Sequence, residues 1–203
     1  MLSRFASFAV TVIAASGLLF AVALPAAAQS GSLCAINGTA NITPGLSNTD
    51  QSFIFTFNGA LSTCQSNVAN APTQATVGIG QTIIVNGLLA QEPAATGSGS
   101  CVTGSGAGIA FTSWADGTMT IVSFTNQSVT GAVDLSGNVI DSVTLPVINP
   151  QPGQPTTVNV ATTRYNGDQL QSVVAFQADP QQCAGAGVTS AAVTGIAAVG
   201  AAQ

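Results

Sequence analysis

The chain has 203 residues, with Lys+Arg 2, Asp+Glu 7 and no histidine, so its formal net charge is −5 and charged residues make up 4% of it. Globular proteins usually carry roughly a quarter charged residues. The scarcity of Lys and Arg argues against nucleic-acid binding and against recognition of anionic membrane surfaces. The lack of histidine excludes a histidine base or a histidine metal ligand.

The N-terminal segment has the pattern of a secretory signal peptide. One arginine precedes an uncharged apolar run over 8–24, and a proline and three alanines follow it. We expect residues 1–28 to be removed by cleavage between Ala28 and Gln29, leaving a secreted domain over 29–203. A retained membrane anchor is the alternative, because the run is close to the length that spans a bilayer.

The remainder of the chain is rich in Thr, Val, Ser and Gly, which is typical of strands joined by tight turns. Phe53, Phe55 and Phe57 alternate with smaller residues, so the pattern places three rings on one face of a strand. We expect this face to lie in the core rather than to form a ligand platform. The further expected strands cover residues 81–90, 119–125, 128–135, 139–147, 157–165 and 170–178. The expected turns are Asp116-Gly117, Ser136-Gly137-Asn138 and Asn166-Gly167-Asp168.

The spacing of about ten short strands predicts an all-β fold. An antiparallel β-sandwich, Ig-like or built of two halves, is the favoured architecture, and a β-barrel is the alternative. The Gly- and Ser-rich stretch 97–106 suggests a flexible connector between pseudo-repeated halves over 29–96 and 97–203. We expect the uncharged stretch 184–203 to form a terminal strand that closes the sheet rather than a membrane helix.

Four cysteines lie outside the signal segment: Cys34, Cys64, Cys101 and Cys183. In an exported protein an even number of cysteines predicts two disulfide bonds. Their spacing is too wide for the close cysteine pairs of a zinc site. A weak internal repeat favours the pairing Cys34–Cys64 and Cys101–Cys183, since the first cysteine of each pair precedes a phenylalanine-bearing strand by the same interval. Coincidence within low-complexity sequence is the alternative.

The residues available for catalysis are few. Without histidine no Ser-His-Asp or Cys-His arrangement can form. A pair of carboxylates can catalyse glycoside hydrolysis, but Asp116 and Asp168 lie in expected turns, where Asp is favoured for backbone reasons. We therefore expect no enzyme, no cofactor and no metal site. Two stretches, Asn48-Thr49-Asp50 and Asn166-Gly167-Asp168, are weak calcium candidates without the EF-hand pattern, and a turn is the favoured interpretation of both. Glycosylation sequons, relevant only in a eukaryotic source, begin at Asn37, Asn41 and Asn126.

Several short strings give the chain a resemblance to a group of exported proteins. They are CVTGSGAG at 101–108, WADGT at 114–118, NGTA at 37–40 and TPGL at 43–46. The chain resembles small secreted actinobacterial proteins that are rich in Thr, Gly and Ala. The resemblance implies export and a β fold, and it carries over no functional residues because that group has no assigned activity.

These observations together predict a secreted, non-enzymatic β protein of the extracellular space or the cell envelope. We expect a structural or adhesive role first, with cell-wall polymer, another protein or further copies of the chain as partners. One alternative is a protein- or glycan-binding module. Others are an extracellular protease inhibitor that presents an exposed loop at 149–155 and a pore in an outer lipid layer.

Overall fold

The computed structural model describes residues 31–200. The expected signal peptide over 1–28 and its cleavage site lie outside the described residues. The described elements are β1 (Ser32–Leu46), β2 (Gln51–Ser66), β3 (Ala75–Ile79), β4 (Thr82–Val85), β5 (Leu88–Gln91), β6 (Ala95–Gly99), β7 (Thr103–Trp114), β8 (Met119–Val129), β9 (Ala132–Val139), β10 (Ser142–Pro146), β11 (Thr157–Ala161), β12 (Gln169–Gln177), α1 (Pro180–Ala184) and β13 (Val188–Val199).

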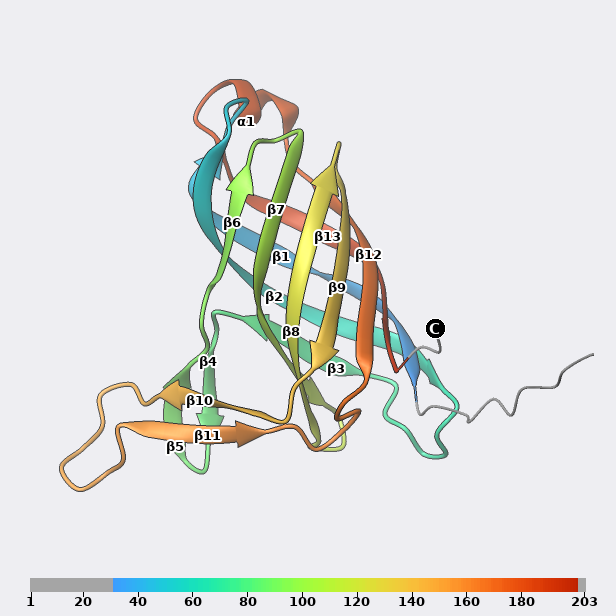
Figure 1. Cartoon of the computed structure of the whole chain (residues 1–203), viewed down its shortest axis with the longest axis vertical. Coiled ribbons are helices and arrows are strands. Elements are labelled where there is room, and N and C mark those ends of the chain that lie inside the picture. The colour runs from blue at the N-terminus through green and yellow to red at the C-terminus, as the bar shows by residue number, and fades with distance from the viewer. Residues whose placement is uncertain (1–30, 201–203) are drawn as a thin grey trace, which may run out of the picture.

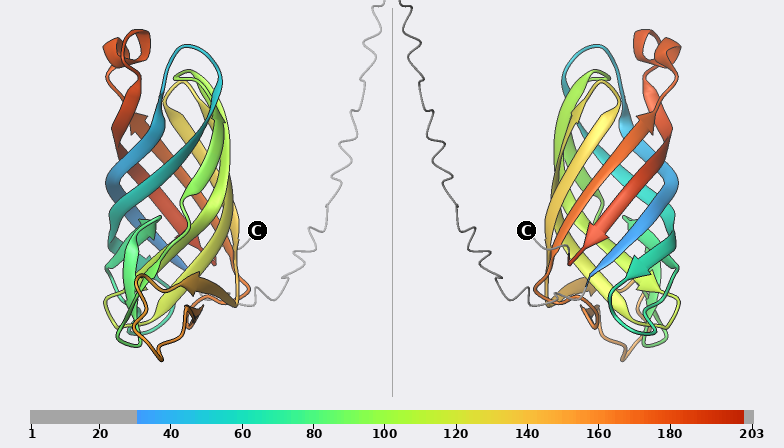
Figure 2. Two further views of the ribbon diagram at one scale, coloured as in Figure 1. Left: turned by 90° about the vertical axis from the view of Figure 1, so that its left-hand side faces the viewer. Right: turned by 90° about the vertical axis from the view of Figure 1, so that its right-hand side faces the viewer.

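The main sheet closes on itself as an eight-stranded antiparallel barrel (Figures 1 and 2). Around the barrel the order is β1, β13, β12, β9, β8, β7, β3 and β2, and β2 pairs again with β1. β6 and β3 share one position, because each pairs with β2 on one side and with β7 on the other. The expected all-β class is confirmed. The architecture is the β-barrel, which the sequence offered as the alternative. The β-sandwich that the sequence favoured is not observed.

The last strand closes the barrel. β13 pairs with β12 on one side and with β1 on the other, so that Ile196 lies opposite both Val173 and Ala35. The expectation of a terminal strand is therefore confirmed for Val188–Val199. Within residues 31–200, no helix is long and apolar enough to cross a membrane.

Two expected strands are interrupted by turns. The stretch 81–90 forms a hairpin of β4 and β5, because Asn86 and Gly87 adopt the positive φ angles, 51° and 78°, of a tight hairpin turn. The stretch 128–135 is likewise divided by a turn at Thr130 and Gly131. Two expected strands are also too long. The stretch 139–147 begins at the last residue of β9 and otherwise contains β10 (Ser142–Pro146), and 157–165 contains only β11 (Thr157–Ala161).

Two expected turns are not hairpins of the barrel. Ser136-Gly137-Asn138 lies inside β9, where Gly137 faces inward and a Cβ would come 2.8 Å from Val122 Cγ1. The segment Asn166-Gly167-Asp168 connects β11 to β12, but these strands do not pair with each other. β11 pairs with β10, whereas β12 pairs with β9 and β13.

The structure contains the disulfide bonds Cys34–Cys64 and Cys101–Cys183, the pairing favoured from the sequence. The first joins β1 to β2 near the lower end of the barrel, and the second joins the β6–β7 turn to α1 at the upper end (Figure 1). The suggested boundary between residues 96 and 97 falls within β6. Both segments therefore contribute strands to one barrel.

A second apolar cluster lies outside the barrel lumen. The β4–β5 and β10–β11 hairpins, joined by a bridge between Ala90 and Val147, gather below and beside the barrel (Figure 1). Their buried side chains pack on outward-facing residues of β7 and β8. The buried members of this cluster are Ala90, Phe111, Ile121, Leu145 and Val160.

Candidate functional site

Alternate side chains of the barrel strands point into the lumen, and most of them are apolar. The three phenylalanines of β2 face inward as the sequence predicts. Phe57 is 6% exposed, while Phe53 and Phe55 are partly buried. The ring centroids of Phe53 and Phe55 are 6.2 Å apart, and those of Phe55 and Phe124 are 6.4 Å apart. The aromatic side chains thus form one connected surface inside the barrel.

The neighbouring strands make room for these rings with glycine, because Gly97 pairs with Phe53 across β6 and β2, and Gly108 pairs with Phe124 across β7 and β8. A Cβ on Gly97 would come 2.5 Å from the Phe53 ring, and one on Gly108 would come 3.1 Å from the Phe124 ring. Gly97 belongs to the stretch 97–106 that the sequence suggested was a flexible connector. In the structure the stretch 97–106 forms parts of β6 and β7, so that interpretation is wrong. Gly97 and Gly106 pack close to the Phe53 and Phe55 rings, and Gly99 adopts a φ of 146° at the end of β6, so close packing and backbone geometry explain these glycines rather than flexibility.

Aromatic side chains pack together at the lower end of the barrel. The rings of Trp114 and Tyr165 meet edge to face with their centroids 5.6 Å apart, and both residues are buried. The indole Nε1–H donates to Thr120 Oγ1 at 2.9 Å. The Arg164 guanidinium lies 5.5 Å from the Tyr165 ring centroid and forms an ion pair with Asp116. These contacts fix the Trp114 and Tyr165 rings at this end of the barrel.

The Asp116 carboxylate stabilises the turn between β7 and β8. Its Oδ1 accepts hydrogen bonds from the Thr118 hydroxyl, at 2.6 Å, and from the Thr118 N–H, at 3.1 Å. These bonds, together with Arg164, lower the pKa of Asp116. The expected hairpin turn at Asp116-Gly117 is confirmed, and its carboxylate serves the turn and the ion pair.

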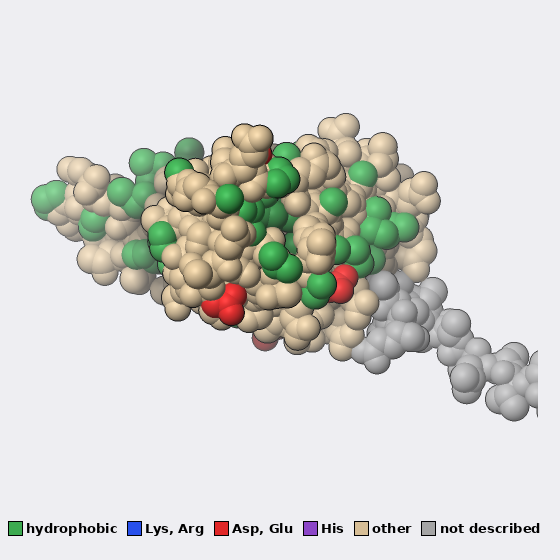
Figure 3. Space-filling model, turned by 90° about the horizontal axis from the view of Figure 1, so that it is seen from above, with side chains coloured by type: hydrophobic (Ala, Val, Ile, Leu, Met, Phe, Trp, Pro, Cys, Tyr) green, Lys and Arg blue, Asp and Glu red, His purple; other side chains and the backbone are tan. Residues whose placement is uncertain are grey.

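The upper end is covered by loops rather than by aromatic rings. The disulfide Cys101–Cys183 holds the β6–β7 turn against the short helix α1. Within this group of loops the Cys101 N–H donates to Ser47 O at 2.8 Å, and the Thr130 N–H donates to Val102 O at 2.7 Å. Seen from above, apolar side chains show between the polar ones at this end (Figure 3).

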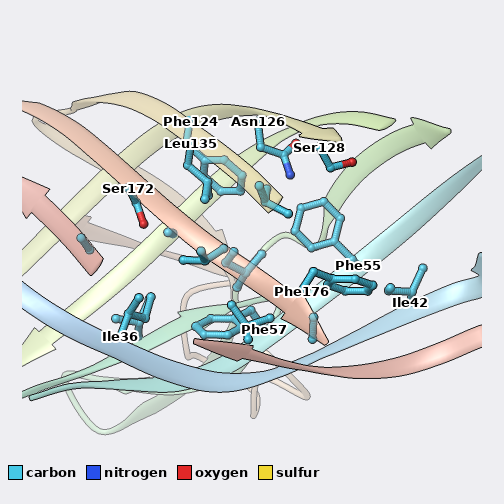
Figure 4. Close-up of a pocket in the computed structure, with 18 of the residues that line it drawn as sticks. Ile36, Ile42, Phe55, Phe57, Phe124, Asn126, Ser128, Leu135, Ser172 and Phe176 are labelled. Atoms are coloured by element: carbon cyan, nitrogen blue, oxygen red, sulfur yellow. The ribbon is translucent and has the colours of Figure 1, made fainter. Parts of the chain in front are cut away.

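A cavity of about 180 Å³ lies between the two ends. Its lining is mainly apolar and comes from every strand position of the barrel. Figure 4 shows part of this lining, with Ile36, Phe57 and Phe124 pointing into the lumen. The polar residues that line it are Ser100, Thr112, Asn126, Ser128 and Ser172. None of the described residues around it is charged. The arrangement can therefore bury an apolar molecule and offer it a few neutral hydrogen-bonding groups.

The acidic residues do not meet in the cavity. Glu92 is 2% exposed and lies on the outer side of β3, where its Oε2 accepts the Gln81 N–H at 3.0 Å. Burial raises the pKa of Glu92 to about 7, although the hydrogen bond from Gln81 lowers it. Burial also raises the pKa of Asp168, which lies in the β11–β12 connection. No group of three or more Cys, Asp or Glu side chains within 31–200 is placed to hold a metal ion.

The sequence analysis missed the cavity and the role of Asn126. It identified Asn126 only as the start of a sequon, but the structure places it on the inner face of β8 among the residues of the cavity. Asn37 and Asn41, the other sequon positions, are exposed on β1. The sequence does contain a pattern that indicates this position. Val122, Phe124 and Asn126 alternate along β8, so the Asn126 amide lies on the same strand face as two buried apolar residues.

No family model, curated protein or solved structure matches this chain.

Proposed function

We propose that the mature protein is a non-enzymatic extracellular binding protein that holds a small, uncharged, apolar molecule inside its barrel. The observation that carries this proposal is the apolar cavity of about 180 Å³ inside the barrel. An engineered apolar cavity of about 150 Å³ binds benzene. By that comparison the cavity suits a ligand of roughly six to ten non-hydrogen atoms.

The polarity of the wall supports an internal ligand. Many outward-facing residues of the barrel strands are neutral and polar, such as Asn37, Thr39, Asn41, Ser123, Thr125, Gln127, Ser136 and Asn138. Inward-facing residues are mainly apolar, so a ligand in the lumen leaves water for an apolar environment. A pore needs the reverse polarity, with apolar residues outside and polar residues inside. This contrast favours a binding protein over a pore.

The chemistry of the described residues supports binding rather than catalysis. The cavity is lined by no carboxylate and no cation, and the nearest buried carboxyl group described above, Glu92, lies on the outer side of the wall. Two disulfides indicate an oxidising environment, which fits an extracellular or cell-envelope location.

The test is binding of ethylbenzene to the oxidised mature protein, measured by isothermal titration calorimetry. We expect saturable one-to-one binding with a Kd below about 1 mM. Ala110 faces the cavity from β7, so Ala110→Leu fills part of the space and weakens binding at least tenfold. Ala107 is exposed on the same strand, and Ala107→Leu is the matched control that leaves binding unchanged. Absence of ethylbenzene binding by the folded wild type, or equal binding by both variants, contradicts the proposal.

A structural or adhesive role is the second candidate, favoured by the uncharged outer wall. Asp134 is the one charged residue within the thirteen described strands. Such a surface carries little charge repulsion between copies and suits contact with a neutral polymer. Size-exclusion chromatography of the mature protein at high concentration tests the self-association form of this role. A clean monomer contradicts it.

A further inference from the structure

Two serines on the inner wall, Ser128 and Ser172, already use their protons within the protein. Ser172 Oγ donates to Ile196 O at 2.8 Å, and Ser128 Oγ donates to Gly104 O at 3.3 Å. These hydroxyl groups are therefore satisfied by backbone carbonyl groups of the barrel strands. They give the cavity little capacity to select a polar ligand.

Asn126 differs from these serines. Its Oδ1 atom is buried and has no hydrogen-bond partner. The side chain lies in the lumen close to Phe55 and Phe124 (Figure 4). A Cβ on Gly106 would come 2.6 Å from Asn126 Oδ1, so glycine at that position leaves the space that the amide occupies. The wall thus accommodates a polar group that the protein itself does not satisfy.

An unsatisfied buried amide oxygen such as Asn126 Oδ1 is costly, because its hydrogen bonds to water are lost and nothing replaces them. A ligand that hydrogen-bonds the amide recovers that loss at the moment of binding. Asn126 Oδ1 is an acceptor, so the ligand group that matches it is a donor, such as a hydroxyl group or an amide N–H. An ionised ligand is disfavoured, because no charged side chain of the described lining can neutralise it.

We infer that the cavity selects a small neutral molecule with an apolar body and one hydroxyl or amide group, and that Asn126 binds this group. The inference rests on the proposed function and specifies its ligand class. Phe55 and Phe124 contact the apolar body, and the Asn126 amide fixes its orientation. Asn126 is therefore the specificity-determining residue of the cavity.

The experiment compares three probes of similar size: benzyl alcohol, ethylbenzene and benzoate. Calorimetry gives the ratio of the Kd of ethylbenzene to the Kd of benzyl alcohol for the wild type and for Asn126→Leu. We expect the variant to lower this ratio about tenfold, since leucine keeps the volume but removes the hydrogen bond. Asn58→Leu makes the same change at an exposed position of β2 and leaves the ratio unchanged. Benzoate does not bind measurably.

A second measurement uses the wild type alone and so does not depend on the folding of a variant. The side-chain N–H₂ resonances of Asn126 in ¹⁵N spectra should shift more with benzyl alcohol than with ethylbenzene. If ethylbenzene binds but neither the ratio nor these resonances respond as expected, the role of Asn126 is overturned and the cavity proposal stands. Binding of benzoate comparable to that of benzyl alcohol overturns the neutral-ligand class. If ethylbenzene itself does not bind, the proposed function fails.

Discussion

Replacing Glu92 by glutamine should remove a pH-dependent loss of stability. Burial raises the pKa of this carboxyl group from 4.5 to about 7, so the folded protein holds its proton more tightly than the unfolded chain does. Below pH 4.5 both states are protonated, and above pH 7 both are ionised. Between these values only the unfolded chain has lost the proton, so the free energy of unfolding falls as the pH rises.

The size of the effect follows from the two pKa values. At about 1.4 kcal/mol per pH unit, the interval from 4.5 to about 7 corresponds to about 3 kcal/mol. Glu92→Gln retains a carbonyl oxygen that can accept the Gln81 N–H and carries no titrating proton. Relative to wild type, the variant should therefore gain about 3 kcal/mol of stability between pH 4.5 and pH 8.

Urea unfolding at pH 4.5, 6 and 8 measures this difference, with the fluorescence of the single tryptophan as the signal. Asp134→Asn removes one negative charge from an exposed position on β9 and controls for the change in net charge. Taking differences between variant and wild type cancels the titration of the other groups. A difference between Glu92→Gln and wild type that stays constant from pH 4.5 to pH 8 would refute the linkage of this proton to folding.

Three further predictions concern packing and covalent structure. Gly59→Ala should destabilise the protein by about 1–3 kcal/mol in urea unfolding, because the new Cβ would come 2.4 Å from Phe57 Cζ; a variant as stable as wild type contradicts this. Replacing Cys101 and Cys183 together by serine opens a link across 82 residues and should cost about 4 kcal/mol, measured the same way. An unchanged midpoint would show that the link does not constrain the unfolded chain. Thr120→Val leaves the buried indole N–H without its acceptor and should cost about 1–3 kcal/mol, whereas a neutral result by calorimetric Tm contradicts that role.

The sequence predicts the class of the fold because that class depends on local patterns. Strand alternation places Phe53, Phe55 and Phe57 on one face, and the Asp116-Gly117 pair predicts its turn. The same alternation and turn spacing occur in sandwiches and in barrels. Closure depends on which distant strands pair, as β1 and β13 do here, and a local pattern does not contain that information.

The cavity was harder to foresee for a similar reason. The glycine-rich stretch 97–106 has the composition of a flexible linker, and the Phe53 ring packed against Gly97 and the positive φ of Gly99 become known only from the structure. Asn126 lies on the same strand face as Phe124. The sequence does not show whether a polar group on such a face has a hydrogen-bond partner, and only the structure shows that Asn126 Oδ1 has none. The Asn86-Gly87 turn was a recognisable signal that the expected single strand over 81–90 overlooked.

The pairing of β1 with β13 also governs how the protein reaches its native state. The two strands that close the barrel, β1 and β13, lie at opposite ends of the described chain. The barrel therefore cannot close until β13 has been synthesised and is free to pair with β1. Before that moment β1 and β12 each present an unpaired edge that can pair with other chains. Contacts between such distant segments make folding slow. Aggregation therefore competes with folding from the time β1 is synthesised until β13 pairs with it.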